Sequence, residues 1–174
     1  MSYPVFATGD VLNASDMNAV GLWLVKTQTI GTGVSSVTVT GAFSADYDNY
    51  LITVNGGTTS SAGDMRLQLG SSTANYKNQI IYAPYSATVL GFTTTTSQFN
   101  YVGSSGTDEA QAQFTLNSPF LTKYTKVTAQ YANDAAFVNF GGIHTVNASY
   151  TAFTLLPSVG TLTGGTIRIY GYRN

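Results

Sequence analysis

The chain has 174 residues, of which 43% are hydrophobic and only 9% are charged, with a formal net charge of −1 and no cysteine. This length fits one domain that buries roughly two thirds of the surface of its unfolded form. The near-neutral composition provides no basic stripe for phosphate backbones, so nucleic acid is not an expected partner. The lack of cysteine excludes disulfides, thiolate nucleophiles and cysteine-based zinc sites.

The sequence shows no signal for export or for membrane insertion. It does not open with a basic segment followed by an apolar run, and it lacks an uninterrupted stretch of about 18 apolar residues. We therefore expect neither a cleaved leader nor membrane insertion. A protein of this kind that works outside the cell would leave by lysis or as part of a particle.

The first segment differs from the rest of the chain. In "TGDVLNASDMNAVG", residues 8–21, Asn13 or Ser15 is a candidate helix cap, Asp16 lies in the first turn and Gly21 is a stop signal. The segment predicts a helix of one or two turns, which is too short to be stable alone. We expect residues 1–22 to dock on the sheet or on a neighbouring chain, and residues 23–174 to form the body.

From Trp23 onward the sequence has the period of two that is typical of strands. Met65, Leu67 and Leu69, for example, alternate with polar residues, which predicts a half-buried strand. The predicted strands are residues 37–43, 50–54, 64–69, 76–82, 98–102, 110–116, 125–131, 136–143, 152–156 and 166–172.

Turn signals rich in Gly, Asn, Asp and Ser separate these strands at intervals typical of an antiparallel β-sandwich of jelly-roll type. A parallel β-helix would show a short repeat, and none occurs, whereas a closed barrel stays open as an alternative. Residues 136–143 and 79–82 are apolar on both faces, which favours a sandwich whose outer side is covered by a second layer or a second subunit.

The last strand, in "TIRIYGYRN", places Ile167 and Ile169 on one face and Arg168, Tyr170 and Tyr172 on the other. Terminal residues fray unless they are tied down, so this pattern predicts a strand built into the sheet. We expect the isoleucines in the core. Arginine and tyrosine are favoured contact residues, so the outer face is a candidate for subunit contact.

Few residues carry chemistry. His144 is the only histidine and has no nucleophile-elbow pattern to accompany it, so a structural role is favoured. Asp108 and Glu109 are adjacent, whereas paired glycosidase carboxylates usually come from separate elements. "SADYDNY", residues 44–50, lacks the further ligands and closing glutamate of a calcium loop, so a turn is favoured. We expect no catalytic residue, no metal and no cofactor.

Tyrosine is abundant, with 12 residues. It supplies a large contact area with a polar tip. The tyrosines at strand ends or beside turns either cap the core, which is the favoured reading, or line a subunit interface or stack on sugar rings. They are Tyr82, Tyr85, Tyr101, Tyr150, Tyr170 and Tyr172.

Three stretches, "FATGDVLNASDMNAVG" (residues 6–21), "FSADYDNYLITVNG" (43–56) and "GGTIRIYGYRN" (164–174), resemble segments of virion structural proteins of tailed bacteriophages, often described as minor structural, tail or fibre proteins. The resemblance does not cover residues 58–158. It implies a non-enzymatic virion component, made in the host cytoplasm and released by lysis. Such a component is often oligomeric, and its N-terminal segment engages another virion protein.

The resemblance implies a homo-oligomer, taken as a trimer from the habit of fibres, in the tail, fibre or baseplate. The alternative is a capsid decoration or head-fibre protein that stabilises the particle, and a third hypothesis is a glycan hydrolase that uses Asp108 or Glu109. Loops 55–64, 93–97 and 102–108 are expected to face a host glycan or protein, with Tyr85, Tyr101 and Asp108 as candidates. The expected oligomer or partner contacts are Phe6, Val11, Leu12, Met17, Trp23, Arg168, Tyr170 and Tyr172.

Overall fold

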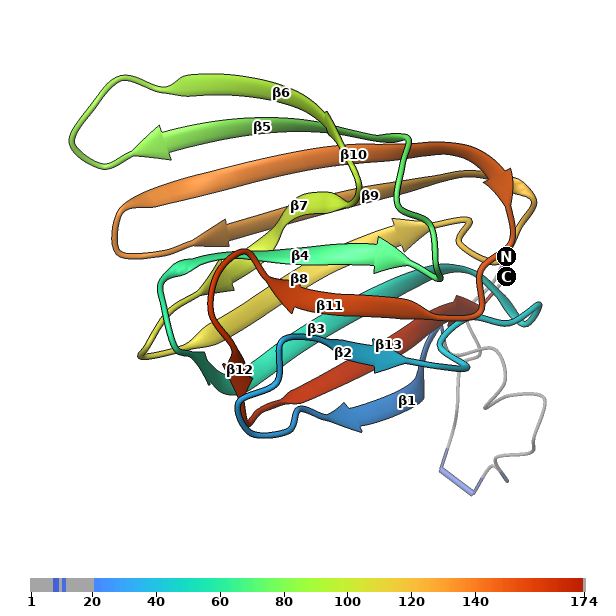
Figure 1. Cartoon of the computed structure of the whole chain (residues 1–174). Coiled ribbons are helices and arrows are strands. Elements are labelled where there is room, and N and C mark those ends of the chain that lie inside the picture. The colour runs from blue at the N-terminus through green and yellow to red at the C-terminus, as the bar shows by residue number, and fades with distance from the viewer. Residues whose placement is uncertain (1–7, 10, 12–20, 174) are drawn as a thin grey trace.

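The computed structural model describes residues 8, 9, 11 and 21–173, and thirteen strands lie within them (Figure 1). The strands are β1 (Leu22–Thr29), β2 (Val37–Val39), β3 (Tyr47–Thr59), β4 (Gly63–Leu69), β5 (Tyr76–Pro84), β6 (Leu90–Thr96), β7 (Phe99–Ser105), β8 (Ala110–Asn117), β9 (Lys123–Ala132), β10 (Ala136–Ala148), β11 (Phe153–Pro157), β12 (Leu162–Thr163) and β13 (Thr166–Arg173).

The prediction of an all-β, antiparallel protein is confirmed, because every strand pair among the described residues is antiparallel. The described residues form no helix, and most of the segment expected to be a short helix, residues 8–21, lies outside them. The jelly-roll topology and the division at residues 22 and 23 stay predictions.

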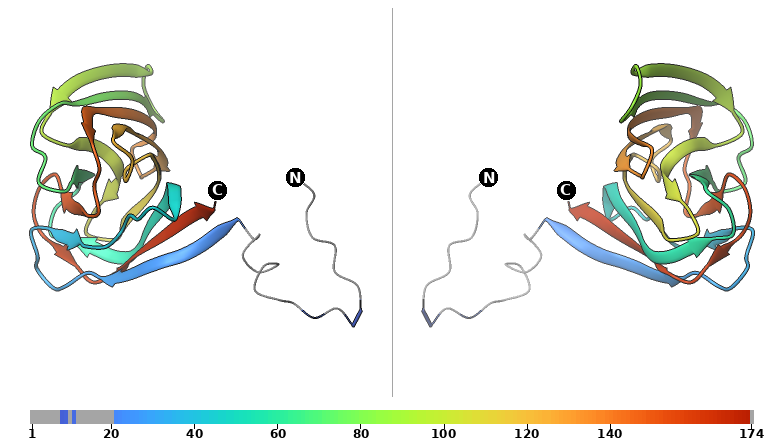
Figure 2. Two further views of the ribbon diagram at one scale, coloured as in Figure 1. Left: turned by 90° about the vertical axis from the view of Figure 1, so that its right-hand side faces the viewer. Right: turned by 90° about the vertical axis from the view of Figure 1, so that its left-hand side faces the viewer.

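The sheet is branched and bends back on itself. One path runs β2-β11-β4-β7-β8-β9-β10-β5-β6, and β3, β13 and β1 continue the sheet from β8. Strands β2, β11 and β4 lie in front of β13, β3 and β8 (Figure 1), and Figure 2 shows the same layering from the side. Strand β7 pairs with both β4 and β8, so it links the two layers.

The core lies between these layers and follows from the alternation in the sequence. Leu67 on β4 and Leu155 on β11 belong to the same buried cluster as Ile52 on β3 and Ile169 on β13. These four side chains have no exposed surface. Each such side chain contributes about 1.5–3 kcal/mol relative to an exposed position.

Strand β13 lies between β1 and β3, as predicted for a strand built into the sheet. Ile167 and Ile169 are fully buried, so their expected core role is confirmed. Arg168 and Tyr170 are half-buried on the opposite face, and Tyr172 is 38% exposed.

Several predicted loops are strands. Residues 93–97 were expected to be a loop, but residues 93–96 belong to β6, because threonine suits a half-covered strand as well as a loop. Likewise β3 continues to Thr59 into the predicted loop 55–64, and β7 continues to Ser105 into 102–108, where Val102 and Ser104 are buried. The predicted strand 37–43 ends at Val39, shortly before Gly41 with its φ of +61°.

The sheet beyond the two layers has a smaller core. Ile80, Tyr131 and Val138 form a second buried cluster on β5, β9 and β10. On the other face of β5 and β10, Ile81 is 49% and Phe137 is 43% exposed. No other layer of the described chain covers these two side chains.

Candidate functional site

His144, the single histidine, lies on β10 and contacts three other residues through its ring nitrogens. Its Nε2 lies 2.7 Å from the hydroxyl oxygen of Tyr150 and 3.1 Å from Oγ of Ser72, and its Nδ1 lies 3.3 Å from the carbonyl oxygen of Asn75. A carbonyl only accepts, so Nδ1 carries the proton and Nε2 accepts from the two hydroxyls. The ring stacks on Tyr76, with 4.2 Å between centroids.

The surroundings favour the neutral form of this histidine. Burial lowers the pKa of His144, and the hydrogen bond to Asn75 opposes that shift. Burial also raises the pKa of Tyr76 to about 12. The contact between Ser72 and His144 resembles part of a hydrolytic triad, but Nδ1 faces a backbone carbonyl where a triad has a carboxylate. The geometry agrees with the structural role that we expected.

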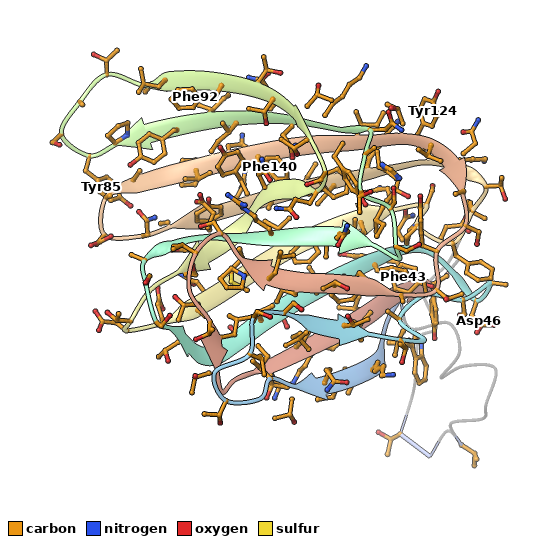
Figure 3. All side chains as sticks on the ribbon, viewed as in Figure 1. Phe43, Asp46, Tyr85, Phe92, Tyr124 and Phe140 are labelled. Carbon is orange, nitrogen blue, oxygen red and sulfur yellow. The ribbon has the colours of Figure 1, made fainter. Side chains whose placement is uncertain are left out.

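Carboxylates line a hollow at one end of the molecule. This is the end where Figure 3 labels Tyr85. Asp64 of β4 lies in the hollow, and the hydroxyl of Tyr131 donates to Asp64 Oδ1 at 3.1 Å. Burial raises the pKa of Asp64, although the hydrogen bond from Tyr131 lowers it. Asp108, Glu109 and Asp134, all exposed, line the same hollow. We call it the acidic hollow.

The sequence placed Asp64 at the end of the expected loop 55–64 and at the start of the strand 64–69, but did not predict its place in this hollow. No local signal could have found it, because the pairing of Asp64 with Ser104 brings it near the turn that carries Asp108. The backbone N–H of Gly106 donates to the carbonyl of Glu109 at 2.7 Å and closes that turn.

A second hollow lies on the outer face of β5, β10 and β9. Ile143 of β10 is in register with Lys77 of β5 and with Lys126 of β9, so it separates two exposed lysines. Gly141 lies in the neighbouring row and leaves the surface open, because a Cβ there would meet no atom within 4 Å. We call this hollow the lysine groove, and its lining residues are Lys77, Asn78, Gln79, Thr93, Lys126, Val127, Thr128, Gly141, Gly142 and Ile143.

An apolar stripe crosses the outer face of β1, β13 and β3. Tyr170 of β13 is in register with Leu24 of β1 and with Leu51 of β3. In the next row, Leu22 pairs with Tyr172. Leu24 is 55% and Leu22 is 43% exposed. These five residues are the outer stripe.

The predicted contact residues fall in different places. Arg168 lies beside the outer stripe, in register with Thr53 on β3. Trp23 is half-buried and, by alternation, faces away from Leu22 and Leu24. Val11 is 84% exposed. Phe6, Leu12 and Met17 lie outside the described residues.

The predicted ligand-facing residues are also separated. Tyr85 is 65% exposed, in the turn between β5 and β6. Tyr101 lies on β7, not in a loop, and packs against Phe140 with 5.9 Å between ring centroids. Asp108 is exposed in the acidic hollow. Of the three, only Tyr85 and Asp108 lie in turns.

Neither a metal-binding cluster nor a membrane-spanning helix occurs among the described residues. No group of three or more His, Cys, Asp or Glu side chains in this part of the chain could hold a metal ion. In the same residues, no helix is long and apolar enough to cross a membrane.

Comparisons with known proteins give only distant likenesses. No family model matches the chain, and no curated protein matches it. Among solved structures, it is similar to the tripod (BppUct-A-L) from the baseplate of bacteriophage Tuc2009, at 12% identity and a TM-score of 0.28, over 100% of this chain and 75% of that one.

A second similarity is to infectious bursal disease virus. For the Gx strain the identity is 14% and the TM-score is 0.17, over 86% of this chain and 38% of that one. For the Gt strain the values are 11% and 0.14, over 86% and 41%. TM-scores this low carry no argument about fold or function.

Proposed function

We propose that this protein is a non-enzymatic structural component of a bacteriophage virion that assembles as a homo-oligomer through the outer stripe. In this proposal the body is an antiparallel β-sandwich of jelly-roll type, and the N-terminal segment binds another virion protein. A trimer in the tail, fibre or baseplate, in contact with the host surface, is the expected form. The resemblance of residues 6–21, 43–56 and 164–174 to phage structural proteins supports the virion location.

The outer stripe is the observation that carries the proposed assembly. Leu24, Tyr170 and Leu51 follow one another in register across three strands, and Leu22 and Tyr172 extend the surface by one row. Strands of a sheet lie about 4.8 Å apart, so the three residues form a continuous apolar ridge roughly 10 Å across. Contiguous exposed apolar surface of this kind marks interaction sites.

The polar residues beside the stripe suit a subunit contact. Arg168 lies in the row next to Tyr170, and both are half-buried on the outer face. Arginine and tyrosine are enriched in interfaces, where they combine apolar area with hydrogen-bonding capacity. This agrees with the contact role proposed for Arg168, Tyr170 and Tyr172 from the sequence.

The assembly is tested with a double variant, Leu24→Ser with Tyr170→Ser. At about 1 M salt, where contacts between charges are screened, we expect the purified protein to be an oligomer in light scattering at micromolar concentration and the variant to be a folded monomer. Val159→Ser is the matched control, because Val159 is 49% exposed in the turn after β11, outside the stripe. At this salt concentration, a monomeric wild-type protein, or a variant that still assembles, would contradict the proposal.

The virion location is tested separately by antibody-gold labelling of intact virions from lysates that contain this protein. Label at tail tips, fibres or baseplates is the expected result. Label spread over the head would instead identify the capsid decoration protein considered as the alternative. Particles that carry no label would contradict the proposed virion location.

A further inference from the structure

Hollows of this molecule are lined by charges of opposite sign, although Asp46 lies on the same side as Tyr124 (Figure 3). Four of its eight acidic residues, Asp64, Asp108, Glu109 and Asp134, line the acidic hollow, and no lysine or arginine lines it. Three of its seven basic residues, Lys77, Lys123 and Lys126, line hollows on a different surface. Lys77 and Lys126 line the lysine groove, and Lys126 also lines an adjoining hollow with Lys123; neither hollow is lined by a carboxylate.

The two surfaces lie at opposite ends of the molecule. The backbone N–H of Tyr85 donates to the carbonyl of Ala135 at 3.2 Å, so Tyr85 marks the acidic end. Tyr124 lines the hollow that contains Lys123 and marks the lysine end. Figure 3 shows Tyr85 and Tyr124 on opposite sides of the molecule.

The path of β9 sets the separation between the two ends. Lys126 of the lysine groove lies six residues before Ala132, the last residue of this strand, so at roughly 3.3 Å per residue the two positions are about 20 Å apart. At physiological salt, interactions between exposed charges that lie more than about 8 Å apart are largely screened. The acidic hollow of one copy therefore cannot neutralise its own lysine groove.

The groove has the shape to receive a narrow turn. Lys77 and Lys126 lie on either side of Ile143, about 10 Å apart at the backbone because two strand spacings separate them. Next to this row Gly141 has no side chain and open space above it. The floor is therefore low in the row next to the two lysines, and the positions around Gly141 are the hydrogen-bonding residues Gln79, Thr93 and Thr128.

The acidic end supplies a turn of complementary charge. The turn between β7 and β8 carries Thr107, Asp108 and Glu109, all exposed. Its base is closed by the hydrogen bond from Gly106 N–H to the Glu109 carbonyl. Two adjacent carboxylates on a tight turn complement two lysines on either side of a shallow groove.

We propose that the turn of residues 106–109 of one copy binds in the lysine groove of the next copy, head to tail. The contact uses two different surfaces, so it is heterologous and produces a ring if it closes or a filament if it does not. The head-to-tail proposal rests on the proposed homo-oligomer only because it requires a second copy of the chain. It differs from the outer stripe because charged contacts weaken in salt, whereas apolar contacts do not depend on charge.

The charge pairing can be tested by reversal. Lys77→Glu with Lys126→Glu leaves a copy with two acidic ends, and Asp108→Lys with Glu109→Lys leaves a copy with two basic ends. Each variant alone should lose head-to-tail association by at least about tenfold, because like charges then face each other. An equimolar mixture should restore it, with the two variants alternating. Thr32→Glu is the control, because Thr32 is exposed and lines none of these hollows.

Sedimentation velocity at about 0.1 M and about 1 M salt measures the outcome, since the screening length falls from about 10 to about 3 Å. The expected wild-type result is a larger species at low salt that dissociates at high salt. Wild-type protein without a salt-dependent species, a single variant that associates like the wild type, or a mixture that stays dissociated would each overturn the proposal.

Two further controls separate this contact from other roles. The outer-stripe variant Leu24→Ser with Tyr170→Ser should keep the salt-dependent association and lose the salt-independent one, so failure of one proposal is distinguishable from failure of the other. Polygalacturonate serves as an acidic glycan probe. If the lysine variant lost binding to this polysaccharide while its self-association stayed unchanged, the groove would belong to an anionic glycan and the head-to-tail contact would be wrong.

Discussion

The Nε2 atom of His144 accepts a hydrogen bond from the hydroxyl of Tyr150, with 2.7 Å between the two atoms. The histidine is fully buried and joins β10 to the turn that contains Ser72 and Asn75. Protonation of Nε2 would remove the acceptor that two hydroxyls use and would place a charge in the core. The arrangement therefore stabilises the fold only while the ring is neutral.

We expect acid to destabilise the protein through His144. Its pKa is about 6.5 when unfolded and lower when folded, because of burial. Between these two values the unfolded state binds a proton that the folded state does not, so the free energy of unfolding decreases as pH falls through this window. Urea unfolding at a series of pH values measures the slope. His144→Gln should flatten it below pH 6.5, and an unchanged slope would contradict the assignment.

Two adjacent glycines on β10 make a matched pair. A Cβ on Gly142 would lie 2.7 Å from Phe99 Cδ1 and 2.9 Å from Val127 Cγ1, whereas a Cβ on Gly141 would meet nothing within 4 Å. Gly142→Ala should lower the free energy of unfolding by about 1–3 kcal/mol, because it overpacks the core. Gly141→Ala should be close to neutral. Equal effects of the two substitutions in denaturant unfolding would show that the core can give way at Phe99.

The two faces of β13 are expected to have different roles, the buried face in stability and the outer face in association. Ile169 is fully buried and its neighbour Tyr170 is half-buried on the outer face. Ile169→Ala should cost about 2–5 kcal/mol of folding free energy, because it removes buried methylenes and leaves a cavity. Tyr170→Ser should change the thermal midpoint much less and reduce the oligomer. Calorimetry and light scattering on both variants check this, and the reverse pattern would contradict the assigned faces.

The pair Tyr131 and Asp64 predicts a pH-dependent stability difference. The folded pKa of Asp64 is raised by burial and lowered by the hydrogen bond from Tyr131, so Tyr131→Phe should raise it further. A raised carboxyl pKa costs stability as pH rises from the unfolded value of about 3.9 through the folded value. The variant should therefore lose about 1–3 kcal/mol at neutral pH and less at acid pH. NMR titration of the Asp64 carboxyl carbon reports the pKa directly, and a loss independent of pH would argue against this account.

The sequence by itself determined the strands whose alternation is strict. Met65, Leu67 and Leu69 are buried as predicted, and Ile167 and Ile169 lie in the core of a strand between two others. Side chains of a strand point to alternate faces because of the pleat, which is a local property. The pattern of apolar residues therefore predicted which face of each strand is inside, without knowledge of its neighbours.

Only the tertiary structure decided which strands are neighbours and in what register. Asp64 meets the turn of Asp108 because β4 pairs with β7, and Lys77 and Lys126 flank Ile143 because β5 and β9 pair with β10 in one particular register. Strand β6 was missed because a run of threonine fits a loop or a strand equally well until a partner such as β5 provides its hydrogen bonds. These pairings join residues far apart in sequence, and a shift of one residue would turn every side chain to the other face. The charged surfaces therefore depend on the register of strand pairing, which cannot be predicted from a local sequence pattern.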